Sequence, residues 1–248
     1  MNKNHFNSEG YLEISKLLPR TLITQLKDHI HRLIEHQPNW AKQSWQFLDP
    51  SQYHNQLGEP LPYTLQRPSL HDDLFETFAH HPTIINRMNE LLQGEVELFT
   101  DQVGVKYGDI NNNQAGCSYY HQDSYYWKLP PNSGVNVWIP LDKVDINKIA
   151  LAIIPKSHHN QSIEDHEHYY DNPEVGNMLE GTWTPFKRHR IPHAKIDLKK
   201  EKVFPMSAGD ALFFTNYTWH RSEPNRCGKT KLFYAIAYRK KVSLLESV

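Results

Sequence analysis

The sequence predicts a mainly β protein with flanking helices, in which an antiparallel jelly roll (a double-stranded β-helix) follows a helical N-terminal part. Apolar residues recur at helical spacing up to about residue 95, whereas short β-rich runs separated by polar turns extend over about 96–241. Helices followed by many short strands are typical of this class. Because no internal repeat or linker divides the chain, we expect residues 1–248 to form one domain.

Three helices are predicted in the N-terminal part. Apolar residues at every third or fourth position predict an amphipathic helix over residues 20–36, between two prolines. Similar spacing predicts helices over about 72–80 and 82–92. We expect the apolar faces of these helices to pack against the β core.

The β-rich part has seven predicted strands and one long insertion. The predicted strands are residues 96–107, 117–123, 134–141, 149–155, 202–205, 211–216 and 231–240. The insertion, about residues 158–195, is rich in His, Asn, Pro and acidic residues and has no clear periodicity, which is typical of a lid or a disordered segment. Together with the loop from Trp40 to Pro68, it is expected to set substrate specificity.

Composition narrows the possible partners. The 27 Lys and Arg residues nearly balance the 28 Asp and Glu residues, so no basic field would attract nucleic acid or an anionic membrane. The two cysteines have no spacing typical of a disulfide framework, and no apolar run is long enough to span a membrane. We therefore expect a cytoplasmic monomer or homodimer that acts on a small molecule.

The tripeptide His121-Gln122-Asp123 is a candidate metal motif. It ends a β-like run in which residues two positions apart point to the same side, so that an imidazole and a carboxylate can reach one ion. A second copy, His71-Asp72-Asp73, introduces a predicted helix, where acidic residues are favoured by the helix dipole. We therefore interpret the second copy as structural and the first as functional.

The third ligand is predicted from a wider pattern. His220 lies just beyond the predicted strand 211–216, and in isolation it would be an ordinary turn histidine. The chain contains, in order, the motifs His121-Gln122-Asp123, Gly209-Asp210-x-Leu212-x-Phe214 and His220-x-Ser222-x-x-Asn225. Further landmarks are Glu9-Gly10-Tyr11, His81-Pro82, Val105-Lys106 and Ile154-Pro155-x-Ser157-His158. In these motifs the sequence resembles the phytanoyl-CoA dioxygenase family of Fe(II)/2-oxoglutarate-dependent oxygenases over most of its length.

The resemblance implies a cupin-like jelly roll in which His121, Asp123 and His220 bind Fe(II), with no other catalytic residues. Two histidines and one carboxylate leave three coordination positions for the cosubstrate 2-oxoglutarate and for O2. The implied reaction hydroxylates an unactivated C–H bond while 2-oxoglutarate is converted to succinate and CO2. Related halogenating enzymes have a small residue in place of the carboxylate, so Asp123 argues against halogenation.

The resemblance also identifies residues that would bind 2-oxoglutarate. Ser222 matches the family's hydroxyl two residues after the second histidine, but the arginine expected eleven residues after it is Lys231. Lys231 is expected to share an inward strand face and to neutralise the distal carboxylate, although without the planar fork of arginine. Lys106 matches another family position near the cosubstrate, and Arg239 and Arg226 are reserve candidates.

Three residues near the ligands are predicted to bind substrate. Tyr126 and Trp127 follow Asp123 closely, and Arg221 occupies a position where the family commonly has glycine, so it either selects a polar substrate or forms a structural ion pair. Cys117 is expected to be a small buried hydrophobic residue. Two other functions stay open: a metalloenzyme that uses the same three ligands without 2-oxoglutarate, and a non-catalytic cupin-like barrel that binds a ligand. The substrate itself is not predicted.

Overall fold

The computed structural model describes residues 2–108, 118–169 and 174–241. The α-helices in these ranges are α1 (Asn2–Glu9), α2 (Arg20–His36), α3 (Asn39–Ser44), α4 (Asp73–Ala79), α5 (Pro82–Leu92) and α6 (Asp123–Trp127). Short 3-10 turns are η1 (Pro68–Leu70), η2 (Ser157–Asn160), η3 (His193–Lys195) and η4 (Leu198–Lys200). Within these ranges, none of the helices has the length and apolar character needed to cross a membrane.

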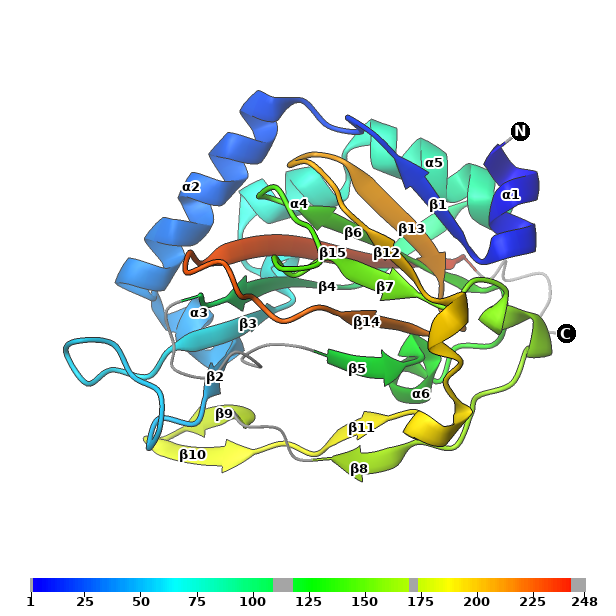
Figure 1. Ribbon diagram of the computed structural model, residues 1–248. Coiled ribbons are helices and arrows are strands. Elements are labelled where there is room, and N and C mark those ends of the chain that lie inside the picture. The colour runs from blue at the N-terminus through cyan, green and yellow to red at the C-terminus, as the bar shows by residue number, and fades with distance from the viewer. Residues whose placement is uncertain (1, 109–117, 170–173, 242–248) are drawn as a thin grey trace, which may run out of the picture.

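The described strands form antiparallel sheets (Figure 1). The large sheet has nine strands in the order β1 (Tyr11–Ile14), β13 (Ala211–Thr215), β6 (Gly134–Pro140), β15 (Lys231–Lys240), β4 (Val96–Lys106), β3 (Pro62–Gln66), β2 (Trp45–Leu48), β9 (Val175–Leu179) and β10 (Thr182–Pro185). A four-stranded sheet has the order β12 (Lys202–Phe204), β7 (Leu151–Ile153), β14 (His220–Ser222) and β5 (Ser118–His121). Strands β8 (Glu167–Tyr169) and β11 (Arg188–Arg190) form a separate pair.

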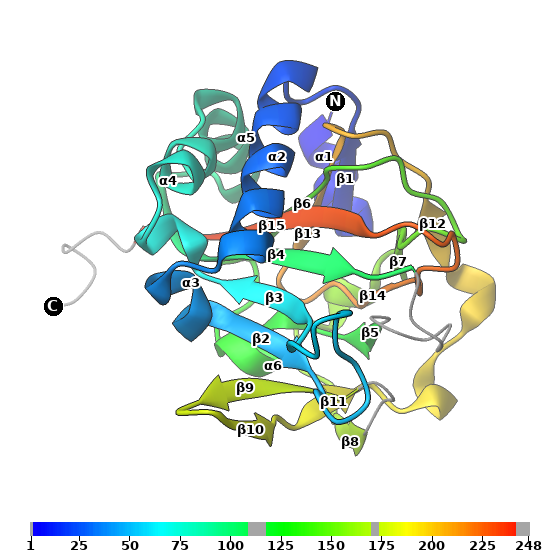
Figure 2. The same ribbon diagram turned by 90° about the vertical axis from the view of Figure 1, so that its left-hand side faces the viewer.

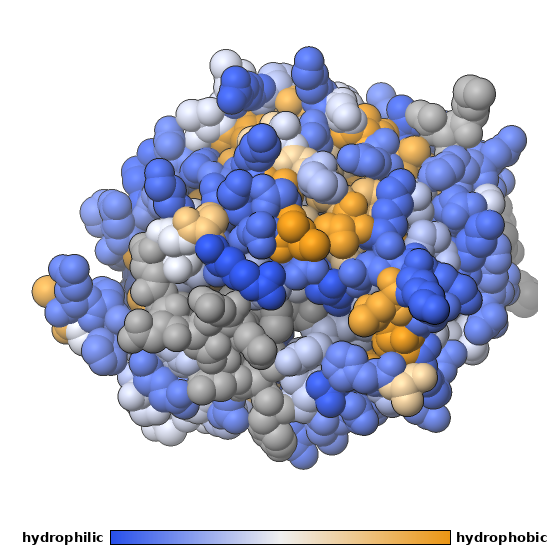
Figure 3. All heavy atoms as spheres, in the orientation of Figure 1, coloured by the Kyte–Doolittle hydropathy of each residue, from blue (hydrophilic) through white to orange (hydrophobic). Residues whose placement is uncertain are grey.

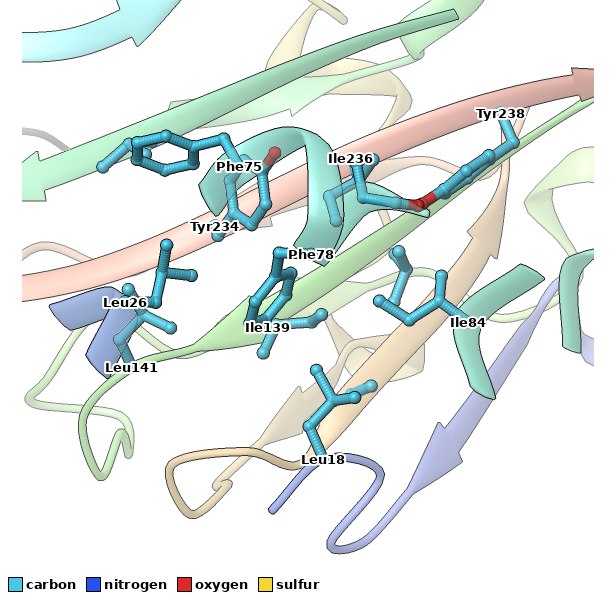
Figure 4. Packing of buried hydrophobic residues seen from close by; sticks show 14 of the residues in the cluster. Leu18, Leu26, Phe75, Phe78, Ile84, Ile139, Leu141, Tyr234, Ile236 and Tyr238 are labelled. Carbon is cyan, nitrogen blue, oxygen red and sulfur yellow. The ribbon is translucent and has the colours of Figure 1, made fainter. Parts of the chain in front are cut away.

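Helices α2, α4 and α5 cover one face of the large sheet, as Figures 1 and 2 show. Helix α2 buries its apolar stripe there, and α4 inserts Phe75 and Phe78 against Tyr234 of β15, with both ring pairs 5.4 Å apart. Figure 4 shows this layer with Ile84 of α5 beside it. Fully buried aromatic and aliphatic side chains contribute most to core stability. The apolar side chains between the helices and the large sheet therefore hold the two together.

The opposite face of the large sheet faces the four-stranded sheet. A second apolar cluster joins the two: Trp138, Phe214 and Ala235 come from the large sheet, and Leu151 and Ile153 come from β7. Two facing antiparallel sheets with flanking helices make up the jelly roll that the sequence predicts.

Figure 3 shows mostly polar residues on one outer face, with apolar residues in small separate groups.

The predicted helices α2, α4 and α5 are confirmed to within one residue at each end. Local signals explain this accuracy: the carboxylate of Asp72 accepts hydrogen bonds from the amides of Leu74 and Phe75 at the start of α4, and Pro82 occupies the first position of α5.

Two expectations about the β-rich part need correction. The strand predicted over 117–123 ends at His121, and Asp123 begins α6 instead; Cys117 lies outside the described residues. The insertion is also more ordered than predicted, because it contributes β8 to β11, and β9 pairs with β2 to extend the large sheet. Strands β8 and β10 are mostly exposed on both faces. Their sequences therefore lack the alternation of apolar and polar residues by which a strand is predicted.

Candidate metal centre

The backbone brings the two proposed histidine ligands side by side. His121 is the last residue of β5 and His220 is the first of β14, and these antiparallel strands pair His121 directly with His220. Side chains of directly paired residues lie on the same face, and the two imidazole centroids are 4.3 Å apart. Asp123, two residues after His121, begins α6 and turns its carboxylate toward both rings.

The three potential ligand atoms are close enough to bind one ion. Asp123 Oδ1 lies 3.9 Å from His121 Nε2 and 3.6 Å from His220 Nε2, and all three atoms lie within 4.8 Å of one another. Two atoms that each bind one ion at about 2.1 Å can be at most about 4.2 Å apart. Both carboxylate–imidazole distances fall inside that limit, and the two imidazole nitrogens lie within 4.8 Å, so a small movement of one ring lets the donor set bind a single ion.

Hydrogen bonds orient each ligand. Nδ1 of His121 donates to the Tyr119 carbonyl at 2.8 Å, and Nδ1 of His220 donates to the Thr218 carbonyl at 3.0 Å. A carbonyl accepts only, so it fixes the proton on Nδ1 and leaves the lone pair of Nε2 for a metal. The amide of Asn136 donates to Asp123 Oδ2 at 3.2 Å, which leaves Oδ1 facing the imidazoles.

Burial sets the charge of this group. Burial lowers the pKa of His121 to about 3, with a further contribution from the charge of His220, and lowers the pKa of His220 to about 4. Burial also raises the pKa of Asp123 to about 6. At pH 7 the site therefore holds two neutral imidazoles and a carboxylate, whose single negative charge favours a divalent cation.

We expect metal affinity to decrease as the pH falls through about 6. Above this pH the carboxylate of Asp123 is ionised, whereas below it a bound proton must be displaced, which costs about tenfold in affinity per pH unit. The imidazoles should add to this loss only below about pH 4. Co(II) titrations between pH 5 and 8 measure the effect. If the affinity instead falls by about 100-fold between pH 7 and pH 6, two protons must be displaced in that range. That result would show that the histidines titrate normally.

The three ligands open into a cavity of about 380 Å³ between the two sheets. From the large sheet, lining residues come from β2, β3, β4, β15, β6 and β13; others come from α6, β7, β14 and the β8–β11 segment. Tyr126 and Trp127, the two residues proposed to bind substrate, line the cavity, and Tyr126 is held by hydrogen bonds between its hydroxyl and the backbone of His189. A small molecule can therefore approach the three ligands.

A buried lysine lies at one part of this cavity. Lys106, at the end of β4, has only 4% of its surface exposed, and its Nζ lies 3.1 Å from the Tyr63 hydroxyl and 3.5 Å from Ser222 Oγ. Among the residues that the structure describes, no carboxylate lies within ion-pairing distance of this ammonium. Its other neighbours are the rings of Tyr63 and Phe233, whose centroids lie 5.1 and 5.8 Å from Nζ, and a buried cation with only such neutral partners is costly unless an anion joins it. Lys106, Ser222 and Tyr63 thus form a potential anion site.

The structure does not bring Lys231 to the cavity, contrary to the expectation from strand alternation. Phe233, Ala235 and Ala237 of β15 line the cavity, but Lys231 does not, and its ammonium lies 3.8 Å from Asp142. Lys231 is the first residue of β15 and pairs in register with Lys106. Of these two neighbouring lysines, Lys231 lies near the carboxylate of Asp142, which follows β6, and this attraction holds its ammonium outside the cavity. The reserve candidates are also outside: Arg239 pairs with Glu97, and Arg226 is half exposed beside Glu223.

Arg221 likewise does not line this cavity, and its structural interpretation fits better. On β14 it alternates with His220 and Ser222, so it points away from them. Its guanidinium binds both carboxylate oxygens of Glu201, at 2.7 and 2.9 Å, and one oxygen of Glu223 at 2.7 Å. These bonds raise its pKa despite burial. The guanidinium is thus already neutralised and does not reach the cavity that the three ligands line.

Several lining residues could not be identified as functional from the sequence. They include Tyr63, Gln46, Gln66, Gln102 and Asn136. Asn136 had a weak signal, a polar residue among the apolar residues of a predicted strand. Gln102 had a similar weak signal in the predicted strand 96–107, whereas Tyr63, Gln46 and Gln66 had none, since β2 and β3 lie in a segment that was expected to be a loop.

A protein-family comparison matches nearly the whole chain. The family model described as phytanoyl-CoA dioxygenase (PhyH) matches residues 6–232. No curated protein sequence matches the chain.

Several solved structures share the fold. The epimerase SnoN, solved with Fe3+, alpha-ketoglutarate and nogalamycin RO, has 17% identity and a TM-score of 0.68, with 96% of this chain and 82% of SnoN covered. EvdO2 from Micromonospora carbonacea var. aurantiaca, complexed with 2-oxoglutarate, has 16% identity and a TM-score of 0.67, with coverage of 97% and 90%. The non-heme monooxygenase ThoJ has 16% identity and a TM-score of 0.70, with coverage of 97% and 77%. At these identities the likeness establishes the fold.

Proposed function

Because the chain belongs to the phytanoyl-CoA dioxygenase family, we propose that it is an Fe(II)- and 2-oxoglutarate-dependent oxygenase that hydroxylates a C–H bond of a small molecule. One observation carries this proposal. The two imidazoles and the carboxylate of the candidate metal centre lie at the wall of a cavity that is also lined by the buried ammonium of Lys106. One end of the cavity suits a metal, and another suits an anion.

His121, Asp123 and His220 would hold the iron. Two imidazoles and one carboxylate are the ligand set of many oxygen-using Fe(II) centres, and the three remaining positions would face the cavity. When bound, Fe(II) would activate O2 as 2-oxoglutarate is converted to succinate and CO2. The protein's part is to keep Nε2 of both rings unprotonated and Asp123 ionised, which the carbonyl partners and Asn136 support.

Lys106 would bind the distal carboxylate of 2-oxoglutarate. The ammonium would gain the anion that its buried position lacks, and Ser222 and Tyr63 would add hydroxyl hydrogen bonds. Leu151 of β7 and Phe233 of β15 also line the cavity and would exclude water from this pair. Of the two lysines that the sequence motifs suggested for the cosubstrate, Lys106 would therefore neutralise the distal carboxylate in place of Lys231.

Hydroxylation is the proposed outcome because the carboxylate of Asp123 would bind the metal where a halogenating enzyme would need room for a halide. The same fold carries other outcomes, since SnoN is described as an epimerase, SnoK as a carbocyclase and ThoJ as a monooxygenase. The cavity of about 380 Å³ supports a small-molecule substrate.

Stepwise anaerobic reconstitution tests this proposal. Addition of Fe(II) and then 2-oxoglutarate to the metal-free protein should produce a weak visible charge-transfer band, because the cosubstrate chelates iron. Succinate in place of 2-oxoglutarate should give no band. Absence of the band with iron bound would favour an enzyme that uses the same ligands without 2-oxoglutarate; absence of iron binding would favour a non-catalytic barrel.

A further inference from the structure

Part of the cavity wall is a row of neutral polar side chains on the large sheet. Gln46 of β2, Gln66 of β3 and Gln102 of β4 all line the cavity, together with Thr64 and Thr100. Their positions follow from strand register: Gln66 pairs with Gln102, and Gln46 pairs with Thr64, so these side chains share the inner face of three adjacent strands.

The three amides are linked to one another. Nε2 of Gln66 donates to Oε1 of Gln46 at 3.3 Å and to Oε1 of Gln102 at 3.2 Å. Each glutamine is half-buried, so amide atoms remain accessible from the cavity. Either orientation of the three amides leaves both donors and acceptors for a ligand, since an amide carries both. The mutual bonds hold the three planes in place before a ligand arrives.

Aromatic rings supply a second kind of surface. Tyr126 and Trp127 of α6, Tyr169 of β8 and Phe186 line the same cavity and do not come from the glutamine-bearing strands. Figure 1 shows α6 and β8 on the far side of the large sheet from the helical layer. Aromatic faces bind the C–H faces of ring-shaped ligands, and amides bind the hydroxyls at their edges.

Charge in this part of the cavity favours neither an anionic nor a cationic ligand. Of the lining cations, Lys106 belongs to the proposed cosubstrate site, and the guanidinium of Arg188 already lies over the Tyr169 ring, 5.2 Å from its centroid. Among the described lining residues, the carboxylates are Asp123, the proposed iron ligand, and Asp101. The Asp101 carboxylate is bound by Ser69 and Tyr234, whose ring packs in the helical layer. A long apolar ligand is disfavoured as well, because it would remove water from three amides and return no hydrogen bond.

We propose that the substrate is a neutral, hydroxyl-rich ring, such as a sugar or a glycosylated compound, whose hydroxyls bind Gln46, Gln66 and Gln102. This inference rests on the proposed function for the identity of the reaction, but the binding of the ring does not depend on the metal. The amide row would fix which ring C–H faces the three ligands. It would thereby determine the position that is oxidised.

Calorimetric titration of the anaerobic protein, loaded with Fe(II) and 2-oxoglutarate, tests this with three ring probes: methyl β-D-glucopyranoside, cyclohexylammonium and cyclohexanecarboxylate. The glucoside is expected to bind at least about tenfold more tightly than either ion. Replacing all three glutamines by methionine, which is similar in size but cannot make these bonds, should weaken glucoside binding by at least about tenfold, since each lost bond costs roughly threefold to tenfold. Gln43→Met, at an exposed position of α3, should leave it unchanged.

Two further measurements separate the possible failures. If the triple variant unfolds, Gln66→Met, which removes the amide that bonds to both neighbours, should still weaken glucoside binding relative to Gln43→Met. A titration of the metal-free wild-type protein should still detect binding of the glucoside. If the protein binds the glucoside but neither iron nor 2-oxoglutarate, the proposed function is overturned and this inference stands. No glucoside binding, equal binding by the triple variant, or tighter binding of either ion would overturn the inference.

Discussion

Replacing His220 or His121 with alanine is expected to weaken Fe(II) binding by at least about 100-fold and to abolish turnover. Changes to residues that merely orient a ligand typically cost about 10- to 100-fold, so loss of a direct ligand should cost more. Each variant would leave Asp123 with a single imidazole at the site. Anaerobic Fe(II) titration of the metal-free proteins measures the loss, and circular dichroism verifies the fold.

His71→Ala is the matched control, because His71 belongs to the second His-x-Asp tripeptide. Its ring stacks on Trp40 with centroids 5.6 Å apart, and Asp72 beside it caps α4. Iron affinity should stay within about twofold of wild type in this variant. Asn136→Leu should have an intermediate effect of about 10-fold, because only the hydrogen bond to Asp123 is lost. Unchanged iron affinity in both His121→Ala and His220→Ala would refute the proposed ligand set.

Lys106→Met is expected to weaken 2-oxoglutarate binding by about 30-fold or more while iron affinity changes little. Truncating one partner of a buried charge pair costs about 2–5 kcal/mol, much of it from the charge left unpaired. Methionine preserves most of the lysine side-chain volume in this buried position. Calorimetric titration of 2-oxoglutarate into the Co(II)-loaded protein measures binding without turnover.

Lys231→Met distinguishes the two lysines that pair across β4 and β15. Its ammonium lies near Asp142 and not in the cavity, so 2-oxoglutarate binding should change by less than about threefold. Arg239→Met, in which an exposed ion pair with Glu97 is lost, should also have little effect. A larger loss in Lys231→Met than in Lys106→Met would mean that Lys231 turns into the cavity when the cosubstrate binds.

The architecture was largely predictable because its signals are local. Helices α2, α4 and α5 have clear apolar periodicity and recognisable first turns, and the main β strands are short runs between polar turns. Strands β2 and β3 were missed since they lie in a segment dense in polar and turn-forming residues. Their pairing with β4 is a long-range contact that no local pattern records.

The candidate metal site was predictable from the sequence, although strand alternation is only part of the physical reason. Strand alternation placed His121 and Asp123 on one side, although Asp123 starts a helix. The direct pairing of His121 with His220 is what brings the second imidazole to the site. Helix-capping chemistry correctly separated the structural copy at Asp72 from the copy that lies at the cavity.

The positions of the residues proposed to bind cosubstrate and substrate depend on side-chain conformations that a sequence does not determine. Lys106 and Lys231 are paired in register, and the position of Asp142 decides which one remains in the cavity. Arg221 lies between His220 and Ser222 on β14, so its side chain points to the opposite face of the strand. On that face Glu201 and Glu223 neutralise it. The two segments expected to set specificity, about 40–68 and 158–195, do contribute cavity residues, including Gln46, Gln66 and Tyr169.

The measurement that tests the central claim most directly is O2-dependent conversion of 2-oxoglutarate to succinate by the purified protein with Fe(II). Even without the substrate, slow uncoupled conversion should occur in wild type, and it should be lost in His220→Ala and retained in His71→Ala. Iron-dependent succinate formation that follows this pattern is the predicted result. No succinate from wild type, or equal succinate from His220→Ala, would contradict the assignment of His121, Asp123 and His220 as the iron site of a 2-oxoglutarate-dependent oxygenase.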